Sequence, residues 1–125
     1  MALTGYVNVD CLIHDAASGA FKAVDVESSL AVSGKVARIS GQATAGGVEV
    51  DPASSGYRDA TGAAVSMASL SAVVVKGTSD LTLVAGDVQL FAPAGQAAYS
   101  GLDSYAGNVT VSGDGNYDLV LIGPA

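Results

Sequence analysis

The sequence predicts an all-β protein, specifically an antiparallel β-sandwich or barrel with little helix. Apolar residues recur at every second position in most segments, and turn-forming residues recur at short intervals between them. A period of two places alternate side chains on opposite faces, as in a strand with one face buried. Because 125 residues suffice for one domain with its own core, we expect a single β-rich domain over residues 1–125.

The first two segments alternate most regularly. In LTGYVNVDCLI, one face of a predicted strand carries Leu3, Val7, Val9, Cys11 and Ile13. HDAASG (14–19) predicts a turn, and AVDVESSLAVS (23–33) predicts a second strand that places Val24, Val26, Leu30 and Val32 in alternation, with Ser28 between them. Gly34 and Lys35 predict another turn. Val36 is out of step with Ile39, so we expect a bulge or a change of face near Arg38.

The middle of the chain contains one ambiguous element. VEVD (48–51) predicts a strand, and the segment from Asp51 to Gly62 predicts a long surface loop. Residues 63–77 fit either a helix with a stripe of Met67, Leu70 and Val74 or a strand. The serines and the β-branched run VVV favour the strand, buried on both faces.

The remaining segments predict a hairpin, a loop and a second hairpin. DLTLVAGDVQLFAPAG alternates on both sides of AGD, which is typical of a hairpin. QAAYSGLDSYAG (96–107) is interpreted as a loop. The last stretch, NVTVSGDGNYDLVLIGPA, predicts strands on both sides of a turn in which residues 113–116 adopt positive φ.

That last stretch also resembles a calcium loop, because Asp114, Asn116 and Asp118 alternate. A helix-flanked calcium loop needs a glycine at its sharp bend and a bidentate glutamate at its end. Leu119 occupies the glycine position and no glutamate follows. We therefore interpret the stretch as a hairpin and predict no metal site.

Other candidates for chemistry are incomplete. His14 is the only histidine, and Cys11 the only cysteine, so a zinc site at this pair would lack a second pair of ligands. A serine or cysteine nucleophile would have no other base than His14. The carboxylates Glu27, Glu49 and Asp51 are on strand segments, where alternate carboxylates usually form a solvated face. We predict no catalytic, cofactor-binding or metal-binding residues, no cofactor, and no enzymatic activity.

Composition restricts the partners. The net charge is −7 and the five bases are scattered, whereas a nucleic-acid-binding protein concentrates positive charge along a phosphate path. The longest uncharged apolar run, at residues 63–75, is shorter than the ~20 residues of a membrane helix. The amino terminus lacks the basic and apolar regions of a secretory signal, and a single cysteine suits folding in a reducing cytoplasm. We expect neither nucleic acid nor membrane as a partner.

A small, acidic chain rich in valine, alanine, glycine and serine, with strands such as SLAVSGKVARIS and SAVVVKG and an extended terminus MALTGYVNVD, resembles the small virion structural proteins of tailed bacteriophages, in particular capsid decoration or cement proteins. The resemblance implies a non-enzymatic protein that assembles in multiple copies, often as trimers, on the major capsid protein and stiffens the shell. It also implies a virion location after synthesis in the host cytoplasm. Residues of about 1–9 are then an arm that reaches a neighbour.

Two alternatives remain open at this stage. Within the virion class, the alternative is a tail tube or fibre subunit, which sequence alone does not separate from a decoration protein. From another class, a carbohydrate- or surface-binding β-sandwich would use Tyr57, Tyr99 and Tyr105 as exposed aromatic platforms on loops.

Overall fold

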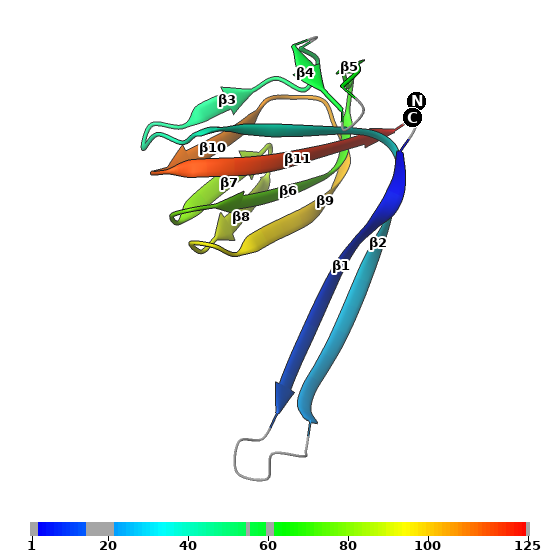
Figure 1. Cartoon of the computed structure of the whole chain (residues 1–125), viewed down its shortest axis with the longest axis vertical. Helices are drawn as coiled ribbons and strands as arrows, with labels where there is room; N and C mark the ends of the chain where they lie inside the picture. Colours follow the sequence, from blue (N-terminus) through cyan, green and yellow to red (C-terminus); the bar gives the residue numbers. More distant parts are fainter. Residues whose placement is uncertain (1–2, 15–21, 55, 60–61, 125) are drawn as a thin grey trace.

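The computed structural model describes the backbone of residues 3–14, 22–54, 56–59 and 62–124, with side chains from residue 34 onward. Its strands are β1 (Leu3–His14), β2 (Lys22–Gln42), β3 (Val48–Val50), β4 (Tyr57–Arg58), β5 (Ala64–Val65), β6 (Leu70–Gly77), β7 (Leu81–Ala85), β8 (Val88–Ala92), β9 (Ala97–Tyr105), β10 (Val109–Gly113) and β11 (Asn116–Pro124). The described residues contain no helix, which confirms the all-β prediction (Figure 1).

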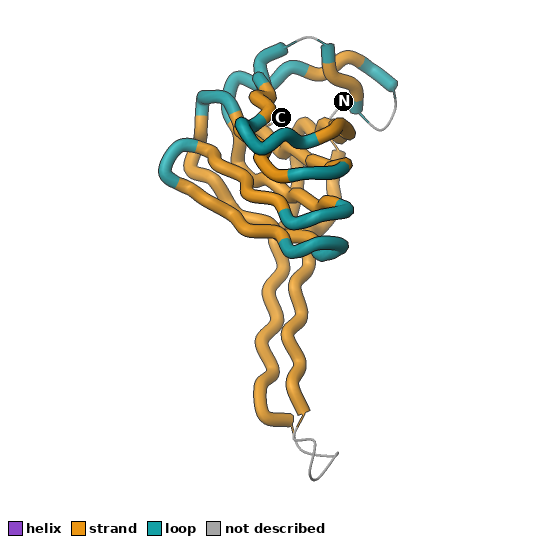
Figure 2. Tube along the Cα trace, turned by 90° about the vertical axis from the view of Figure 1, so that its left-hand side faces the viewer, coloured by secondary structure: helices purple, strands orange, loops and turns teal. Residues whose placement is uncertain are grey.

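Two antiparallel sheets form the body of the protein. Sheet A has the strand order β1-β2-β11-β6-β9, and sheet B has the order β3-β10-β7-β8. A short third sheet pairs β4 with β5. Sheets A and B lie face to face as separate layers, so the protein is an open sandwich and not a closed barrel (Figures 1 and 2).

The core lies between the two sheets and consists of small and medium aliphatic side chains. Sheet A contributes Leu119 and Leu121 from β11, and sheet B contributes Leu83 from β7 and Val109 and Val111 from β10, all fully buried. These residues alternate with more exposed ones along their strands, because successive side chains in a strand point to opposite faces. The period of two in the sequence therefore marks the inward face of each layer.

Strand β2 continues through Gly34 and Lys35, so the predicted turn at these residues is wrong. Gly34 pairs with Leu3 on one side and with Pro124 on the other. It is the position at which β2 leaves its partner β1 and joins β11. Figure 1 shows β2 bending between the part that pairs with β1 and the part that pairs with β11. The glycine marks a change of pairing partner, which local sequence does not distinguish from a turn.

The predicted bulge near Arg38 is also wrong. The pairing of β2 with β11 runs without a register shift from Gly34 to Gln42. Ala37 is buried in the core and Ile39 packs against it, while Val36 packs on the outer face of sheet A with Ile122. Val36 and Ile39 are out of step because sheet A has apolar residues on both faces.

Two predicted loops contain strands. In the segment from Asp51 to Gly62, β4 pairs with β5, although the turns around it are surface loop. Residues 97–105, predicted as loop, form β9 and pair with β6 from Leu70 to Lys76. Strand β9 has an edge position and glycine, serine and aspartate in its sequence, so it lacks the apolar alternation of a central strand. Long-range pairing with β6 makes it a strand.

The predictions of a strand in residues 63–77 and of the β7–β8 hairpin are confirmed. Residues 63–77 form β5 and β6, not a helix, and β6 is buried at most of its positions. Strands β7 and β8 form the predicted hairpin, with Ala85 paired to Val88 and Gly86 at a φ of 62° in the turn. VEV forms β3 as expected. The predicted turn at 14–19 lies outside the described residues except for His14, which ends β1.

The last stretch turns between the two sheets and is not a hairpin. Strand β10 pairs with β3 and β7 in sheet B, whereas β11 pairs with β2 and β6 in sheet A. The connection therefore crosses the sandwich. Gly113 and Gly115 have φ values of 142° and 87°, while Asp114 and Asn116 do not have positive φ. A hairpin and a crossing turn both require glycines here, so local composition did not separate them.

Candidate interaction surfaces

A long two-stranded arm projects from the sandwich. It consists of β1 and the first part of β2, with Leu3 paired to Gly34 at its base and His14 paired to Lys22 near its tip. A strand of 12 residues spans about 40 Å. Figures 1 and 2 show the arm extending away from both sheets. The arm includes residues 3–9, where the sequence predicts an extension, but it is a hairpin of more than twice that length.

The register of the arm gives it one apolar and one polar face. Partners in an antiparallel pair share a face. The apolar arm face combines Leu3, Gly5, Val7, Val9, Cys11 and Ile13 of β1 with Val24, Val26, Ser28, Leu30, Val32 and Gly34 of β2. The polar arm face pairs Thr4, Tyr6, Asn8, Asp10 and Leu12 with Ser33, Ala31, Ser29, Glu27 and Asp25. No charged residue is on the apolar arm face.

No other part of the described chain covers the arm. Strand β1 makes extensive contact with β2 alone, and β2 meets β11, β4 and β5 through its second half. A two-stranded hairpin is marginal in water unless a third element packs on its apolar face. The apolar arm face is therefore the strongest candidate for an interaction surface in this protein.

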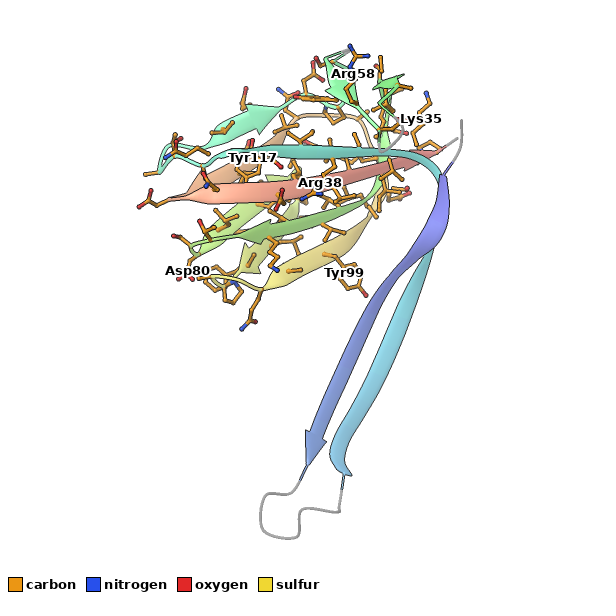
Figure 3. All side chains as sticks on the ribbon, viewed as in Figure 1. Lys35, Arg38, Arg58, Asp80, Tyr99 and Tyr117 are labelled. Carbon is orange, nitrogen blue, oxygen red and sulfur yellow. The ribbon has the colours of Figure 1, made fainter. Side chains whose placement is uncertain are left out.

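The outer face of sheet A forms a second, smaller surface. Ile122 and Ala72 are buried there, with Val36 and Val120 packed against them. Register places Val120 between Arg38 and Val74, and Asp118 between Ser40 and Lys76. The side chains on this outer face therefore change from apolar to polar along β11. Figure 3 shows Arg38 lying across the middle of this face.

Asp118 is the centre of the polar end. Its Oδ1 accepts a hydrogen bond from Ser40 Oγ at 2.6 Å and a charged one from Arg38 Nη2 at 3.3 Å. The Ser40 bond, and then the Arg38 bond and charge, lower the pKa of Asp118 below its ordinary value. Both side chains of the ion pair are largely exposed, so its contribution to stability is small.

This ion pair predicts a specific pH dependence. A carboxyl with a lowered folded pKa stabilises the fold above its unfolded pKa of about 3.9, and the contribution disappears as the pH falls through the folded value. We expect Asp118→Asn to unfold at slightly lower urea concentration than the original protein at pH 6, and at the same concentration at pH 2. Urea titrations at both pH values measure this. An equal difference at both would contradict the role of the charge.

A shallow depression lies beside this polar end. Its volume is about 530 Å³, and Lys76, Asn116, Tyr117 and Asp118 line it together with small residues of β2 and β6. The ring of Tyr117 covers Gly41, where a Cβ would be 2.7 Å from the phenol oxygen. Burial, and then the neighbouring Tyr57, raise the pKa of Tyr117. The lining holds one carboxylate and one amine, which suits contact with a polar group.

The residues considered for chemistry are dispersed. Asp114 accepts from its neighbour Gly115 N at 2.9 Å, and Asp118 is bonded to Ser40 and Arg38. Glu27 lies on the arm, Glu49 is exposed on β3, and Asp51 accepts from Ala53 N. Cys11 and His14 lie on β1. Among the described residues, no three His, Cys, Asp or Glu side chains cluster as a metal site would require.

The three tyrosines do not form exposed platforms on loops, so that prediction is wrong. Tyr57 and Tyr105 are half-buried against the core, and the Tyr105 hydroxyl donates to Asn108 O at 2.6 Å. Tyr99 lies half-buried on β9, paired with Val74 (Figure 3). The sequence reasoning missed Phe91, whose side chain is 61% exposed on β8. Phe91 lies between Leu90 and Ala92, which point inward, so the period of two could have predicted its outward position.

Comparisons with known proteins give no relative. No family model, curated protein or solved structure matches the chain. In the part of the chain that the structure describes, no helix is long and apolar enough to cross a membrane.

Proposed function

We propose that this protein is a non-enzymatic structural component of a virus particle, a capsid decoration or cement protein that assembles in multiple copies and stabilises the shell. The projecting arm carries this proposal. A sandwich with its own core, and a long amphipathic hairpin that no other part of the described chain covers, are suited to reach a neighbouring protein.

The core supports the same role. Sheets A and B bury a continuous cluster of aliphatic side chains, so the body is expected to remain folded whether or not the arm is engaged. The arm is then available to bind the major capsid protein or another copy. Gly5, which has no side chain, allows close approach of a partner backbone near the base of the arm.

Purified particles test the proposal directly. If the protein decorates a shell, mass spectrometry of virions from the source that encodes it should find the chain in tens to hundreds of copies. Electron microscopy should find it on the head. Density on the tail would replace the decoration role by that of a tail tube or fibre subunit. Absence of the chain from particles would refute the virion role altogether.

Matched arm variants test the surface. We expect Val7→Asp to reduce binding to undecorated particles at least about tenfold, because it places an unpaired charge in an apolar contact. Asn8→Asp adds the same charge one residue away on the polar arm face and should bind nearly as well as the original. Co-sedimentation with particles measures both. Equal binding by Val7→Asp and the original would show that the apolar arm face does not contribute to assembly on the shell.

A further inference from the structure

We infer that the apolar arm face is an interface between two copies of this chain, with two arms packed face to face in antiparallel orientation. This inference rests on the proposed assembly function and adds the partner of the arm and its direction. The partner is a second copy's arm.

Charge selects a self-contact for this face. The chain carries a net charge of −7, so two copies repel each other over most of their surface. The apolar arm face is uncharged in all six register pairs from Leu3 with Gly34 to Ile13 with Val24. It is a face on which two copies can meet without placing like charges in contact.

The face is also self-complementary in size. A two-fold axis perpendicular to the strands brings β1 over the second copy's β1 and β2 over its β2. We place this axis at the level of Asn8. Gly5 of each copy then faces Cys11 of the other copy, and Ser28 of each copy faces Leu30 of the other. Each of these two small residues, Gly5 and Ser28, therefore meets a larger one.

The distribution of acids selects the antiparallel direction. Four acids and one base lie in residues 1–34, so the arm carries −3 of the net charge and the rest of the chain −4. Asp10, Asp25 and Glu27 belong to the half of the arm nearer its tip, together with Lys22. Parallel arms would bring both acidic tips together and both acidic bodies together. Antiparallel arms separate each pair by about the 40 Å length of an arm.

In the antiparallel arrangement each acidic tip reaches the base of the other arm. That base carries exposed Lys35, whose Nζ donates to Ser66 O at 3.1 Å, and Arg58 on the neighbouring β4 (Figure 3). Arg58 pairs with Ala64 of β5, two residues before Ser66, so both bases are at the same end of the body. Acids on the polar face of one arm and bases of the other copy's body therefore lie at the same end of the pair.

The area of the contact sets its strength. A ribbon about 40 Å long and 10 Å wide presents roughly 400 Å² on one face, so two arms bury roughly 800 Å² in total. Stable interfaces bury about 1,200–2,000 Å². We therefore expect a weak dimer in solution that depends on concentration, and that many copies on one shell would reinforce.

Sedimentation analysis of the purified full chain tests the contact between about 1 μM and 1 mM. We expect reversible dimers for the original protein and for Ser29→Asp, whose new charge is on the polar arm face. Leu30→Asp should raise the dissociation constant at least about tenfold. A monomer at the highest concentration, or equal losses in the two variants, would overturn the inference.

Thiol cross-linking tests the direction. A bismaleimide that spans about 10 Å matches the spacing of packed sheets. Gly5→Cys should cross-link to Cys11 of a second copy and form covalent dimers, and Thr4→Cys, on the polar arm face, should not. The original protein should not cross-link either, because its two Cys11 residues would lie about 20 Å apart. Dimers of the original protein, or none with Gly5→Cys, would overturn the antiparallel direction.

These measurements use no capsid component. A failure of the arm contact in solution therefore leaves the search for the chain in virions unaffected, and absence from virions leaves the dimer measurement unaffected.

Discussion

Replacing Leu119 by alanine is expected to lower the free energy of unfolding by about 2–5 kcal/mol. Leu119 is fully buried at the centre of β11, paired with Ile39 on one side and Val75 on the other. Truncation there removes apolar contacts with both sheets and leaves a cavity that a close-packed sandwich fills only partly. Urea unfolding followed by circular dichroism measures the change.

The control for Leu119 is Phe91→Ala. Phe91 is larger than leucine, but its side chain is 61% exposed on the edge strand β8. We expect this variant to differ from the original by about 0.5 kcal/mol or less. If Phe91→Ala were as destabilising as Leu119→Ala, the assignment of inner and outer faces would be wrong.

Replacing Gly113 by alanine is expected to destabilise the protein by about 2–4 kcal/mol, because backbone strain and a steric clash add together. Its φ of 142° lies in a region that side chains disfavour, and a Cβ would be 2.5 Å from the carbonyl oxygen of Asp80. That oxygen belongs to the backbone and has little freedom to move away. Thermal unfolding of the variant measures the loss.

Gly46→Ala is the matched control for this glycine. Gly46 also lies in a turn, but a Cβ there would meet nothing within 4 Å and its φ is not positive. We expect a change close to zero or a slight stabilisation, because alanine reduces the entropy of the unfolded chain. A loss at Gly46 equal to that at Gly113 would contradict the strain at the crossing turn.

The sequence predicted the layers of this fold better than their connections. The alternation in β7 and β8 identified inward faces correctly, because the period of two follows from the geometry of a single strand. The β7–β8 hairpin was predictable since both strands and their turn lie within a few residues of each other. Local pattern was sufficient wherever the pairing partner was near in sequence.

Three of the incorrect predictions concern partners that are distant in sequence. Strand β9 is a strand because β6 pairs with it, and its own residues AAYSGLDSY indicate no such structure. The glycine-rich composition around Gly113 suits a hairpin turn and a turn that crosses between sheets equally well. At Gly34, the continuous strand β2 changes its pairing partner from β1 to β11. Pairing over long sequence separations is decided by tertiary packing, which a local window does not contain.

The candidate surface was only partly predictable. Alternation identified the apolar residues Val7 and Leu30, but it could not show that they share one face of a hairpin that no other strand covers. An apolar strand face in a sequence is normally assigned to the core. Here the same pattern is on the outside of the body, because the strands extend beyond the sheet that would cover them.

The change of partner at Gly34 has a mechanical consequence. Because β2 is one unbroken strand, a pull on the tip of the arm is transmitted through a single peptide backbone into the ladder that joins β2 to β11 between Gly34 and Gln42. A force directed along that ladder loads its hydrogen bonds together, in shear, and does not open them one at a time. A tether of this kind can transmit tension from a partner bound to the arm to the sandwich, without a compliant linker between them.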